Sequence, residues 1–414
     1  MEEVVVEPPV ACVVCGGTAV ELVLDLGCTA LANKFLATSE LGRPEPVYPL
    51  RLGYCRECTH VQLLDRVPPS AMFTDYLYMS SASDTLKAHL WSLSDVVQRR
   101  ARLTASDLVI DIGCNDGTLL DGFARYGVRL LGVDPAKNLA EITRSKRVER
   151  YIGFFNAETA CEIVQRWGRA SAVTATNTFP HIPKLEDFLT GIEHVLAPGG
   201  VFVIEAHYLM DLLDRCAFDT VYHEHVSYWA LAPMQRLFAR HGMQVVDVER
   251  LPIHHGQLRV FVQRRGEGTV QPRVAELLDL ERVRGLNRFE TYQRFAGQAQ
   301  RIKRELRQTL SRLAAQGKRL AGYGAPAKAS TLLGFVGIGP ERLAYIADNN
   351  PLKQGRYIPG VRIPVVPPAR ILEDPPDYLL LLAWNFTDEI MRQQAEYRTR
   401  GGKFIIPVPE VQYL

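Results

Sequence analysis

The sequence has almost no excess of either charge. Its 48 lysines and arginines are balanced by 46 aspartates and glutamates, which gives a formal net charge of +2. Proteins that bind nucleic acid or an anionic membrane usually carry a basic excess on one face, so this balance supports neither partner. We therefore expect no nucleic-acid partner and no membrane partner.

Long apolar runs are also missing. The most apolar stretch, YLLLLAW at residues 378–384, is far shorter than the roughly 18 residues that a membrane-spanning helix needs. The N-terminal residues MEEVVVEPPV begin acidic and lack the basic segment that opens a secretory signal. A soluble, cytoplasmic protein is expected.

A single ordinary hydrophobic core does not account for 414 residues, so two or three domains are expected. Strand-like runs alternate with helical segments in two separate blocks, which predicts α/β sheets with helices on both faces. We expect an N-terminal lobe over 1–70, a central domain over 71–270, a helical connector over 271–316 and a smaller α/β domain over 317–414.

Four of the eight cysteines form two CxxC pairs, Cys12 with Cys15 and Cys55 with Cys58. Zinc binds four thiolates in a tetrahedron, and two CxxC turns supply them from tight loops. The rival interpretations are two unrelated reduced pairs or one redox CxxC. A redox motif opens a helix after a strand, and neither pair is placed in that way. Four cysteine ligands leave no open position, so we expect a structural Zn2+ ion.

The most informative run is DLVIDIGCNDGTLLDGFARYGVRLLGVDPA, at residues 107–136. One apolar strand ends in Asp111, a turn with Gly113 and Gly117 follows, and the next strand ends in Asp134. The dinucleotide-binding turn G-x-G-x-x-G differs, because a carboxylate beside the turn repels a diphosphate. An NAD-dependent nucleotide-sugar dehydrogenase or epimerase is therefore the weaker alternative. The acids suit a ligand with an ammonium group and a ribose, as in S-adenosylmethionine.

This run resembles motif I of the class I S-adenosylmethionine-dependent methyltransferases, whose core is a Rossmann-like sheet. TATNTFPHI at 174–182 falls where that fold carries its fourth strand, and LAPGGVFVIEA at 196–206 resembles the lead into the fifth. The resemblance implies a set of cofactor-binding residues at the strand ends. They are Asp111, Gly113, Asn115, Gly117, Asp134 and Asn177.

Motifs along the whole chain resemble those of the nucleotide-sugar C-methyltransferases. They are the two CxxC pairs, YHEH at 222–225, GAPAK at 324–328 and DNNPLKQGRYIPG at 348–360. The resemblance implies methylation of a dTDP-linked 4-keto-6-deoxysugar in the synthesis of branched antibiotic sugars. It is strongest to the C-3 methyltransferases of the tetronitrose pathway, and C-5 methyltransferases of noviose-type sugars share much of the pattern.

The same resemblance implies a C-terminal Rossmann-like domain that holds the nucleotide sugar. Its expected substrate-binding residues are Lys328, Ser330, Asp348, Lys353 and Arg356, and an interaction domain that binds no phosphate is the rival interpretation. Two departures concern this domain. Ala329-Ser330 stand where the family usually has Gly-Asn, and the usual Asp-Asp-Asn-Pro reads Asp348-Asn349-Asn350-Pro351.

The stretch FDTVYHEHVSYW, at residues 218–229, crowds ionisable and aromatic side chains together. Methylation next to a ketone needs a base that removes a C–H proton, so that the enolate carbon attacks the sulfonium methyl. Histidine has the unperturbed pKa closest to this task. The resemblance implies five catalytic residues: Tyr76, His181, Tyr222, Glu224 and His225.

Among them we expect His225 to be the base, oriented by Glu224. Tyr222 is expected to donate or accept a proton on the other face, with His181 and Tyr76 near the ketone and the methyl group. A metal site built on the H-x-H pair of residues 223 and 225 is the rival interpretation. For the whole chain, the alternative functions are methylation at C-5 and a scaffold that binds nucleotide sugar without catalysis. We expect the protein to be a monomer.

Overall fold

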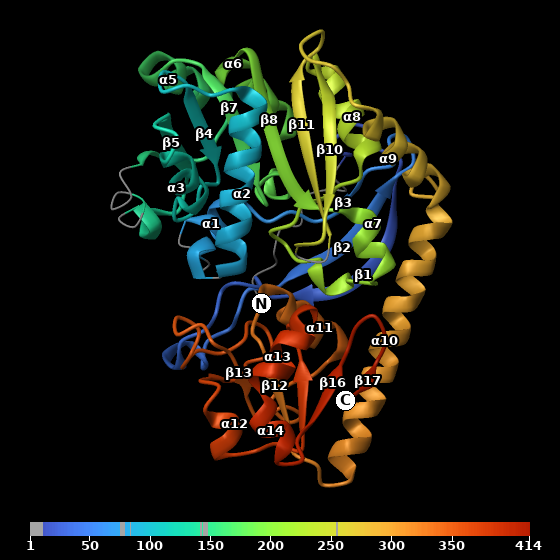
Figure 1. Cartoon of the computed structure of the whole chain (residues 1–414). Coiled ribbons are helices and arrows are strands. Elements are labelled where there is room, and N and C mark those ends of the chain that lie inside the picture. The colour runs from blue at the N-terminus through green and yellow to red at the C-terminus, as the bar shows by residue number, and fades with distance from the viewer. Residues whose placement is uncertain (1–10, 75–78, 83, 141–142, 144–147, 254–255) are drawn as a thin grey trace.

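The computed structural model describes residues 11–74, 79–82, 84–140, 143, 148–253 and 256–414. Its strands form sheets of seven, four and six strands. Figure 1 shows the seven-stranded sheet at the top, the four-stranded sheet in the middle and the six-stranded sheet at the bottom. Within the described ranges, no helix is long and apolar enough to cross a membrane.

The seven-stranded sheet has the order β10-β11-β8-β7-β4-β5-β6. Pairs from β8 to β6 are parallel, whereas β11 pairs antiparallel with both β8 and β10. The strands are β4 (Leu108–Ile112), β5 (Arg129–Asp134), β6 (Glu149–Ile152), β7 (Ala170–Thr176), β8 (Leu196–His207), β10 (Met243–Leu251) and β11 (Gln257–Arg264). The strand order reverses beside β4, and open α/β sheets bind ligands at the carboxyl ends of strands at such a point.

Helices cover both faces of this sheet, which confirms the Rossmann-like fold. Leu108, Ile110 and Ile112 of β4 pack with the apolar residues of α5 and α6, whereas Val109 packs with those of α2 and α3. Successive strand side chains point to opposite faces, so a strand buried on both faces is mostly apolar, and in β4 the exception is Asp111. The helices are α1 (Ser70–Phe73), α2 (Asp84–Ala101), α3 (Thr118–Ala124), α5 (Ala157–Trp167), α6 (Leu185–Val195), α7 (Leu209–Asp214) and α8 (Leu231–Arg240).

The four-stranded sheet is antiparallel, with the order β1-β2-β3-β9. Its strands are β1 (Val20–Thr29), β2 (Tyr48–Cys55), β3 (Val61–Leu63) and β9 (Ser227–Tyr228). The first three come from the expected N-terminal lobe. The fourth lies within the stretch 218–229, which the sequence places in the central domain. That stretch is therefore attached to the N-terminal sheet.

The six-stranded sheet has the order β14-β13-β12-β15-β16-β17 and is parallel apart from β17. Its strands are β12 (Leu320–Tyr323), β13 (Ile346–Ala347), β14 (Val365–Val366), β15 (Tyr378–Leu381), β16 (Lys403–Ile406) and β17 (Gln412–Tyr413). Its helices are α11 (Ala327–Val336), α12 (Arg370–Glu373), α13 (Thr387–Gln393) and α14 (Ala395–Thr399).

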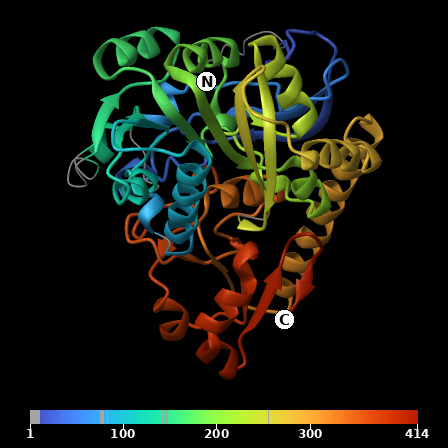
Figure 2. The same ribbon diagram turned by 45° about the horizontal axis from the view of Figure 1, so that its top comes forward.

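The segment between the two α/β parts is helical. It contains α9 (Pro272–Val283) and α10 (Phe289–Ala315). Figure 2 shows α10 running along one side of the molecule, down to the C-terminal sheet. Ile302, Leu306, Leu310 and Leu313 are buried at helical spacing along it.

The N-terminal lobe also contacts the C-terminal part directly. Leu36 forms an antiparallel bridge with Tyr357. Arg362 donates hydrogen bonds to the carbonyl oxygens of Leu41 and Arg43, each at 2.9 Å. Helix α11 packs against β1 and against the 3-10 turn Phe218–Thr220. The stretch 218–229 therefore lies where all three parts meet.

Candidate active site

The turn after β4 has a backbone that favours glycine. Gly113 and Gly117 have φ angles of 74° and 77°, in the left-handed region. A Cβ atom on Gly113 would lie only 2.1 Å from Oγ1 of Thr178. Gly117 is the N-cap of α3, so the turn leads into a helix N-terminus. Asn115 has a φ of 51°, which asparagine tolerates better than most residues.

A buried carboxyl group lies near the end of β4, one residue before the strand ends at Ile112. Asp111 is 2% exposed and accepts a hydrogen bond from Oγ1 of Thr174 at 2.7 Å. Burial raises the pKa of Asp111 to about 7; the Thr174 hydrogen bond lowers it and the nearby Asp134 raises it further. A cation placed against Asp111, such as an ammonium group, favours its carboxylate form.

Asp134 ends the next strand and is held in a fixed orientation. The backbone amides of Asn115 and Ala136 each donate to its carboxylate at 2.8 Å. Nη2 of Arg150 lies 3.1 Å from Oδ1 of the same carboxylate. Burial still raises the pKa of Asp134. An oriented acid at the end of the second parallel strand is the arrangement that binds a ribose diol.

Asn177 follows β7 on the other side of the turn. Its φ is 54°, and its backbone N–H donates to the carbonyl oxygen of Glu205 at 2.8 Å. Its Oδ1 accepts a hydrogen bond from Nε2 of Gln257 at 2.6 Å. The predicted cofactor-binding residues of β4, β5 and β7 thus lie at one edge of the sheet.

The chain before α2 is fastened to this turn. The backbone amide of Ser80 donates to Oδ1 of Asn115 at 3.0 Å, and that of Ser81 donates to Oδ2 of Asp116 at 2.9 Å. The predicted catalytic residue Tyr76 lies outside the described residues, four positions before Ser80.

Tyr222 and His225 form a hydrogen-bonded pair. Oη of Tyr222 lies 2.9 Å from Nε2 of His225, and Nδ1 of the same ring lies 2.9 Å from the carbonyl oxygen of Thr220. A carbonyl oxygen only accepts hydrogen bonds, so Nδ1 of the neutral ring carries the proton and donates it to Thr220. Nε2 is then an acceptor, and the Tyr222 hydroxyl donates to it.

His225 is surrounded by other rings. The ring centroids of His181 and His207 each lie 5.2 Å from that of His225. Burial lowers the pKa of His225 to about 3, with His181 as a further cause. Burial, assisted by His207, lowers the pKa of His181 to about 3 as well. Both imidazoles are therefore neutral at physiological pH, which is the form that accepts a proton.

The structure contradicts the expected partner of His225. Both of its ring nitrogens bond to Tyr222 and Thr220, so Glu224 does not orient it. Oε1 of Glu224 accepts a hydrogen bond from Nδ2 of Asn33 at 2.7 Å instead. The adjacent positions 224 and 225 belong to an irregular turn, where neighbouring side chains separate.

His223 points away from the pair formed by Tyr222 and His225. Its Nε2 lies 3.1 Å from the carbonyl oxygen of Pro49, and its ring packs edge-on against Tyr48 with centroids 5.8 Å apart. Among the described residues, the Cys12, Cys15, Cys55 and Cys58 cluster is the one group of three or more histidines, cysteines and acids with metal-binding geometry. The H-x-H metal site is therefore not formed.

The four cysteines of the two CxxC pairs lie together. Their sulfur atoms are all within 4.8 Å of one another. Cys12 and Cys58 sulfurs are 3.4 Å apart, and Cys15 and Cys55 sulfurs are 3.6 Å apart. These distances exclude disulfides, whose sulfurs are about 2.05 Å apart. A tetrahedral Zn2+ ion with Zn–S bonds of about 2.3 Å places its sulfurs about 3.8 Å apart. The donor set and its spacing fit zinc.

The chain is similar over almost its whole length to a protein of assigned activity. C-methyltransferase NovU from Streptomyces niveus is 38% identical over 407 residues, which cover 98% of this chain and 97% of that protein. The chain belongs to the C-methyltransferase family. It is therefore an S-adenosylmethionine-dependent methyltransferase, as the motifs predict.

Three family models match this C-methyltransferase. A putative zinc binding domain matches residues 12–73, a methyltransferase domain matches 88–248, and a C-methyltransferase C-terminal domain matches 252–409. A ubiquinone biosynthesis O-methyltransferase from Chromobacterium violaceum is 26% identical over 173 residues, covering 37% of this chain and 72% of that protein. Magnesium protoporphyrin IX methyltransferase from Synechocystis PCC 6803, with bound SAH, has a TM-score of 0.33 at 14% identity, covering 43% of this chain and 83% of that one.

Two of the residues expected to bind substrate contact the loop after β12 of this C-methyltransferase, and a third contacts the N-terminal lobe. Oδ2 of Asp348 accepts from the backbone amide of Ala325 at 2.5 Å, and Nζ of Lys353 donates to the carbonyl oxygen of Ala325 at 2.8 Å. Nη1 of Arg356 donates to the carbonyl oxygen of Phe35 at 3.5 Å. These basic groups lie at the carboxyl end of the parallel strands, against the N-terminal lobe.

The other two residues expected to bind substrate lie on α11 and are buried. Oγ of Ser330 donates to the carbonyl oxygen of Ala32 at 3.4 Å. Nζ of Lys328 lies 3.8 Å from Oδ2 of Asp219 and 3.8 Å from the ring centroid of Trp384. The cation of Lys328 thus faces the stretch that carries Tyr222 and His225.

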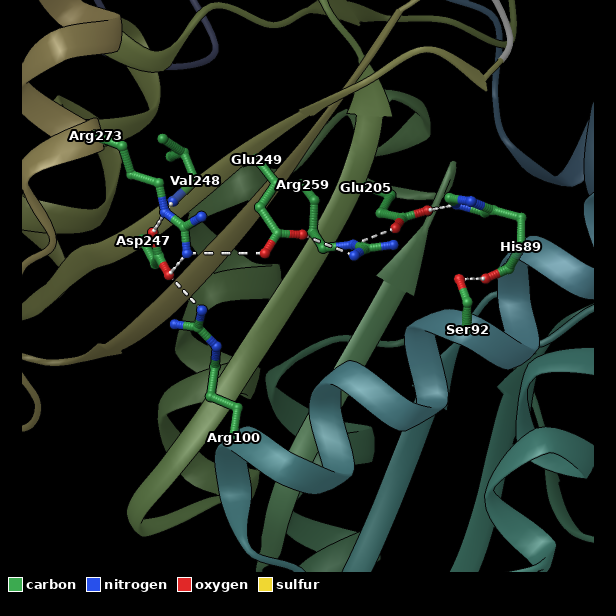
Figure 3. Close-up of polar contacts among 9 residues, drawn as sticks. All are labelled: His89, Ser92, Arg100, Glu205, Asp247, Val248, Glu249, Arg259 and Arg273. Carbon is green, nitrogen blue, oxygen red and sulfur yellow. Dashed lines mark hydrogen bonds and ion pairs between the residues drawn. The ribbon is translucent and has the colours of Figure 1, made fainter.

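A chain of ion pairs connects α2 to the sheet behind the site. Nε2 of His89 lies 2.7 Å from Oε2 of Glu205, and Arg259 Nε lies 2.6 Å from Oε1 of the same carboxylate. Figure 3 shows the chain continuing from Arg259 to Glu249 and, beyond it, to the arginines around Asp247. Burial opposes ionisation of Glu205, but the bonds and charges of His89 and Arg259 lower its pKa below the usual value.

The sequence does not predict three residues of the site: Asn33, Asp219 and His207. Asn33 comes from the N-terminal lobe, and no local pattern connects it to Glu224. Asp219 looks like an ordinary polar residue of the turn. His207 had a usable signal, because it ends the strand predicted from LAPGGVFVIEA and therefore lies at the ligand-binding edge.

Proposed function

We propose that this C-methyltransferase methylates a carbon next to the ketone of a dTDP-linked 4-keto-6-deoxysugar, at C-3. The observation that carries the proposal is the Tyr222–His225 pair. The carbonyl oxygen of Thr220 keeps the ring proton of His225 on Nδ1, so Nε2 accepts a hydrogen bond from the Tyr222 hydroxyl. The pair can therefore take up one proton from the substrate. Carbon methylation needs such an acceptor, because a carbon in a C–H bond has no lone pair and must first lose its proton.

S-adenosylmethionine, when bound, supplies an electrophilic methyl group on its sulfonium. Asp111 is proposed to hold its ammonium group and Asp134 its ribose, with the Gly113–Gly117 turn leaving room for the close approach. Asn177, on the opposite side of the turn, completes the edge. This assignment uses the two oriented acids and the open backbone described above.

The proton transfer is proposed to pass through Tyr222. The phenolic oxygen takes the C–H proton while its own proton moves to Nε2 of His225, which leaves an enolate on the sugar and an imidazolium. The enolate carbon then forms the new C–C bond as the C–S bond breaks, and His225 later returns the proton to solvent. Burial lowers the pKa of His225 to about 3 without substrate, and the negative charge of the enolate is proposed to stabilise the imidazolium.

His181, Glu224 and Tyr76 are proposed to surround the sugar. The ring of His181 stacks between those of Phe73 and His225, with centroids 5.1 Å and 5.2 Å away. A flat stack of this kind leaves the edge of His181 for the ketone oxygen. Glu224 is proposed to accept a hydrogen bond from a sugar hydroxyl or amine, with Asn33 holding its other side.

The C-terminal domain is proposed to hold the nucleotide. Lys353 and Arg356 supply positive charge beside the loop after β12, and Asp348 lies at the same edge. Lys328 and Ser330, also expected to bind substrate, are buried against Asp219 and Ala32, so we propose that they support this site without contacting the nucleotide. In the N-terminal lobe, the four cysteines are proposed to hold a structural Zn2+ ion whose four thiolate ligands leave no position for substrate.

The test is incubation with labelled S-adenosylmethionine and a panel of dTDP-4-keto sugars, followed by NMR to locate the new methyl group. We expect the new methyl group at C-3. A product methylated at C-5 would contradict this position and support the alternative. In D2O, with S-adenosylhomocysteine in place of the methyl donor, the sugar C–H should exchange for deuterium. Binding of the sugars without exchange or methylation would favour a scaffold.

Variants separate the pair from its surroundings. His225→Ala and Tyr222→Phe should each slow C–H exchange by roughly 100-fold or more while S-adenosylmethionine still binds. His223→Asn is the matched control, since His223 faces Pro49 and should leave exchange nearly unchanged. Near-normal exchange by His225→Ala would show that the base is elsewhere.

A further inference from the structure

A buried ionic cluster lies between the C-terminal domain and the catalytic turn. Asp219, in the 3-10 turn Phe218–Thr220, is completely buried. Nε1 of Trp384 donates to its Oδ2 at 2.6 Å, and Nζ of Lys328 lies 3.8 Å from the same oxygen. The Lys328 cation also lies over the face of Trp384, 3.8 Å from the ring centroid. We call these three residues the Asp219 cluster.

Burying the charged groups of this cluster costs free energy that their mutual contacts offset only in part. Within the described residues, Nζ of Lys328 and Oδ1 of Asp219 make no hydrogen bond. Burial lowers the pKa of Lys328 to about 8 and raises that of Asp219, and the two opposite charges compensate each other only in part. Apolar residues of similar volume often stabilise a fold as well as a buried ion pair does. The cluster therefore points to a role other than stability.

The position of Asp219 in the chain indicates that role. The next residue, Thr220, provides the carbonyl oxygen that accepts from Nδ1 of His225. The residue after that, Val221, accepts a hydrogen bond at its carbonyl oxygen from Oγ1 of Thr331 at 2.8 Å. Side chains of the C-terminal domain therefore hold the chain on both sides of Thr220.

We propose that the Asp219 cluster is a positioning device by which the C-terminal domain fixes the Thr220 carbonyl and thereby the tautomer and orientation of His225. Lys328 and Trp384 are then positioning residues for proton removal, although they belong to the domain proposed to bind the nucleotide. The inference rests on the proposed function for the identity of His225 as the proton acceptor. It adds that the base is incomplete without the C-terminal domain.

The first test compares three single variants of the full chain. Trp384→Phe removes the donor to Asp219, Lys328→Met removes the cation and Asp219→Asn removes the negative charge. Each should slow deuterium exchange of the sugar C–H by roughly ten- to 100-fold, because a small displacement of a catalytic group has effects of this size. KM for the nucleotide sugar should stay within about twofold of the parent value.

Trp91→Phe is the matched control. Trp91 is likewise a tryptophan, but its Nε1 makes no hydrogen bond within the described residues and it lies on α2, so Trp91→Phe removes no bond to Asp219. It should leave C–H exchange unchanged. If Trp384→Phe and Lys328→Met instead raise KM by tenfold or more with exchange unchanged, both residues contact the nucleotide and the proposal is wrong.

The second test needs no substrate, so it separates this inference from the proposed function. In protein with 15N-labelled histidine, the ring nitrogens of His225, assigned with His225→Gln, should show a proton on Nδ1. In Trp384→Phe and Lys328→Met the signal should move toward a mixture of the two tautomers. Unchanged tautomers in both variants would refute the positioning role even if the enzyme methylates keto sugars. Shifted tautomers would support it even if the substrate is a different one.

The double variant Asp219→Asn with Lys328→Met distinguishes partial misfolding from a loss of positioning. Removing both charges together leaves no unpaired ion, so the double variant should fold at least as well as either single variant. It should still exchange slowly, because the ion pair between Lys328 and Asp219 no longer holds the residue before Thr220. Recovery of the parent exchange rate in the double variant would show that charge burial, and not positioning, caused the single-variant defects.

Discussion

Replacing Asp111 by asparagine should make the ligand-free protein more stable and the cofactor affinity lower. Burial raises the pKa of this carboxyl from 3.8 to about 7, which corresponds to about 4 kcal/mol between its two protonation states. Because the folded pKa lies above the unfolded one, the folded state binds the proton more tightly. Stability from this group is complete below pH 4 and is lost as the pH rises to 7.

At pH 8 the folded protein carries the full cost of this buried carboxylate. Asp111→Asn removes the charge and keeps an oxygen that accepts from Thr174. We expect a gain on the order of 2 kcal/mol without ligand, since part of the benefit is offset by the buried amide. The gain should vanish as the pH falls below the unfolded pKa of 3.8, where the parent carboxyl is protonated in both states.

The same carboxyl should control how the affinity for S-adenosylmethionine depends on pH. An ammonium ligand needs the ionised form, and at pH 6 only about one in eleven molecules has it when the pKa is about 7. Kd should therefore be about tenfold larger at pH 6 than at pH 8. Thr174→Val, which removes the donor to Asp111, should move this transition to higher pH.

Calorimetric titration from pH 6 to pH 8 and thermal melting without ligand measure the two effects. Asp111→Asn should bind S-adenosylmethionine at least roughly tenfold more weakly at pH 8, and its Kd should lose most of its pH dependence. Undiminished affinity in Asp111→Asn would refute the assignment of Asp111 to the ammonium group. If Asp111→Asn melts at a lower temperature than the parent protein at pH 8 without ligand, the buried carboxylate does not destabilise the fold.

Gly113→Ala should abolish cofactor binding in calorimetry, because the residue has a φ of 74° and its new Cβ would meet Thr178. Asn33→Ala should lower kcat by roughly tenfold, with Kd for S-adenosylmethionine unchanged, because Glu224 loses the donor that orients it. His181 and His225 have folded pKa values of about 3, so their contribution to stability is present above pH 6.5 and lost below it. Urea unfolding should show a loss on the order of 2 kcal/mol per histidine between pH 7 and pH 5. Metal analysis should find one zinc per chain, and its removal by a chelator should lower the melting temperature.

The sequence predicts the parts of the site that depend on short stretches of chain. The turn after β4 and the strand ending at Asp134 occupy 28 consecutive positions from 107, and this run carries the motif from which the cofactor-binding residues are predicted. The paired CxxC turns are similarly local, and their four sulfurs converge as expected. The Rossmann-like sheet follows from the alternation of strands and helices.

The contacts that complete the site are not local, and the sequence does not predict them. Asn33 reaches Glu224 across 191 positions, and Trp384 reaches Asp219 across 165. Any asparagine or tryptophan is an equally good candidate until the fold is known. The error about Glu224 has the opposite cause. Adjacency in sequence suggested contact with His225, but an irregular turn directs the two side chains apart.

The attachment of the stretch 218–229 has a consequence for recombining such enzymes. The stretch adds β9 to the N-terminal sheet, and it hydrogen-bonds to Trp384 and Thr331 of the C-terminal domain. An exchange of the C-terminal domain alone therefore replaces part of the packing around the turn that carries Tyr222 and His225. A functional chimera should carry positions 219, 328, 331 and 384 from a single parent. The boundary suitable for recombination then follows the contacts of the turn and not the boundaries of the three sheets.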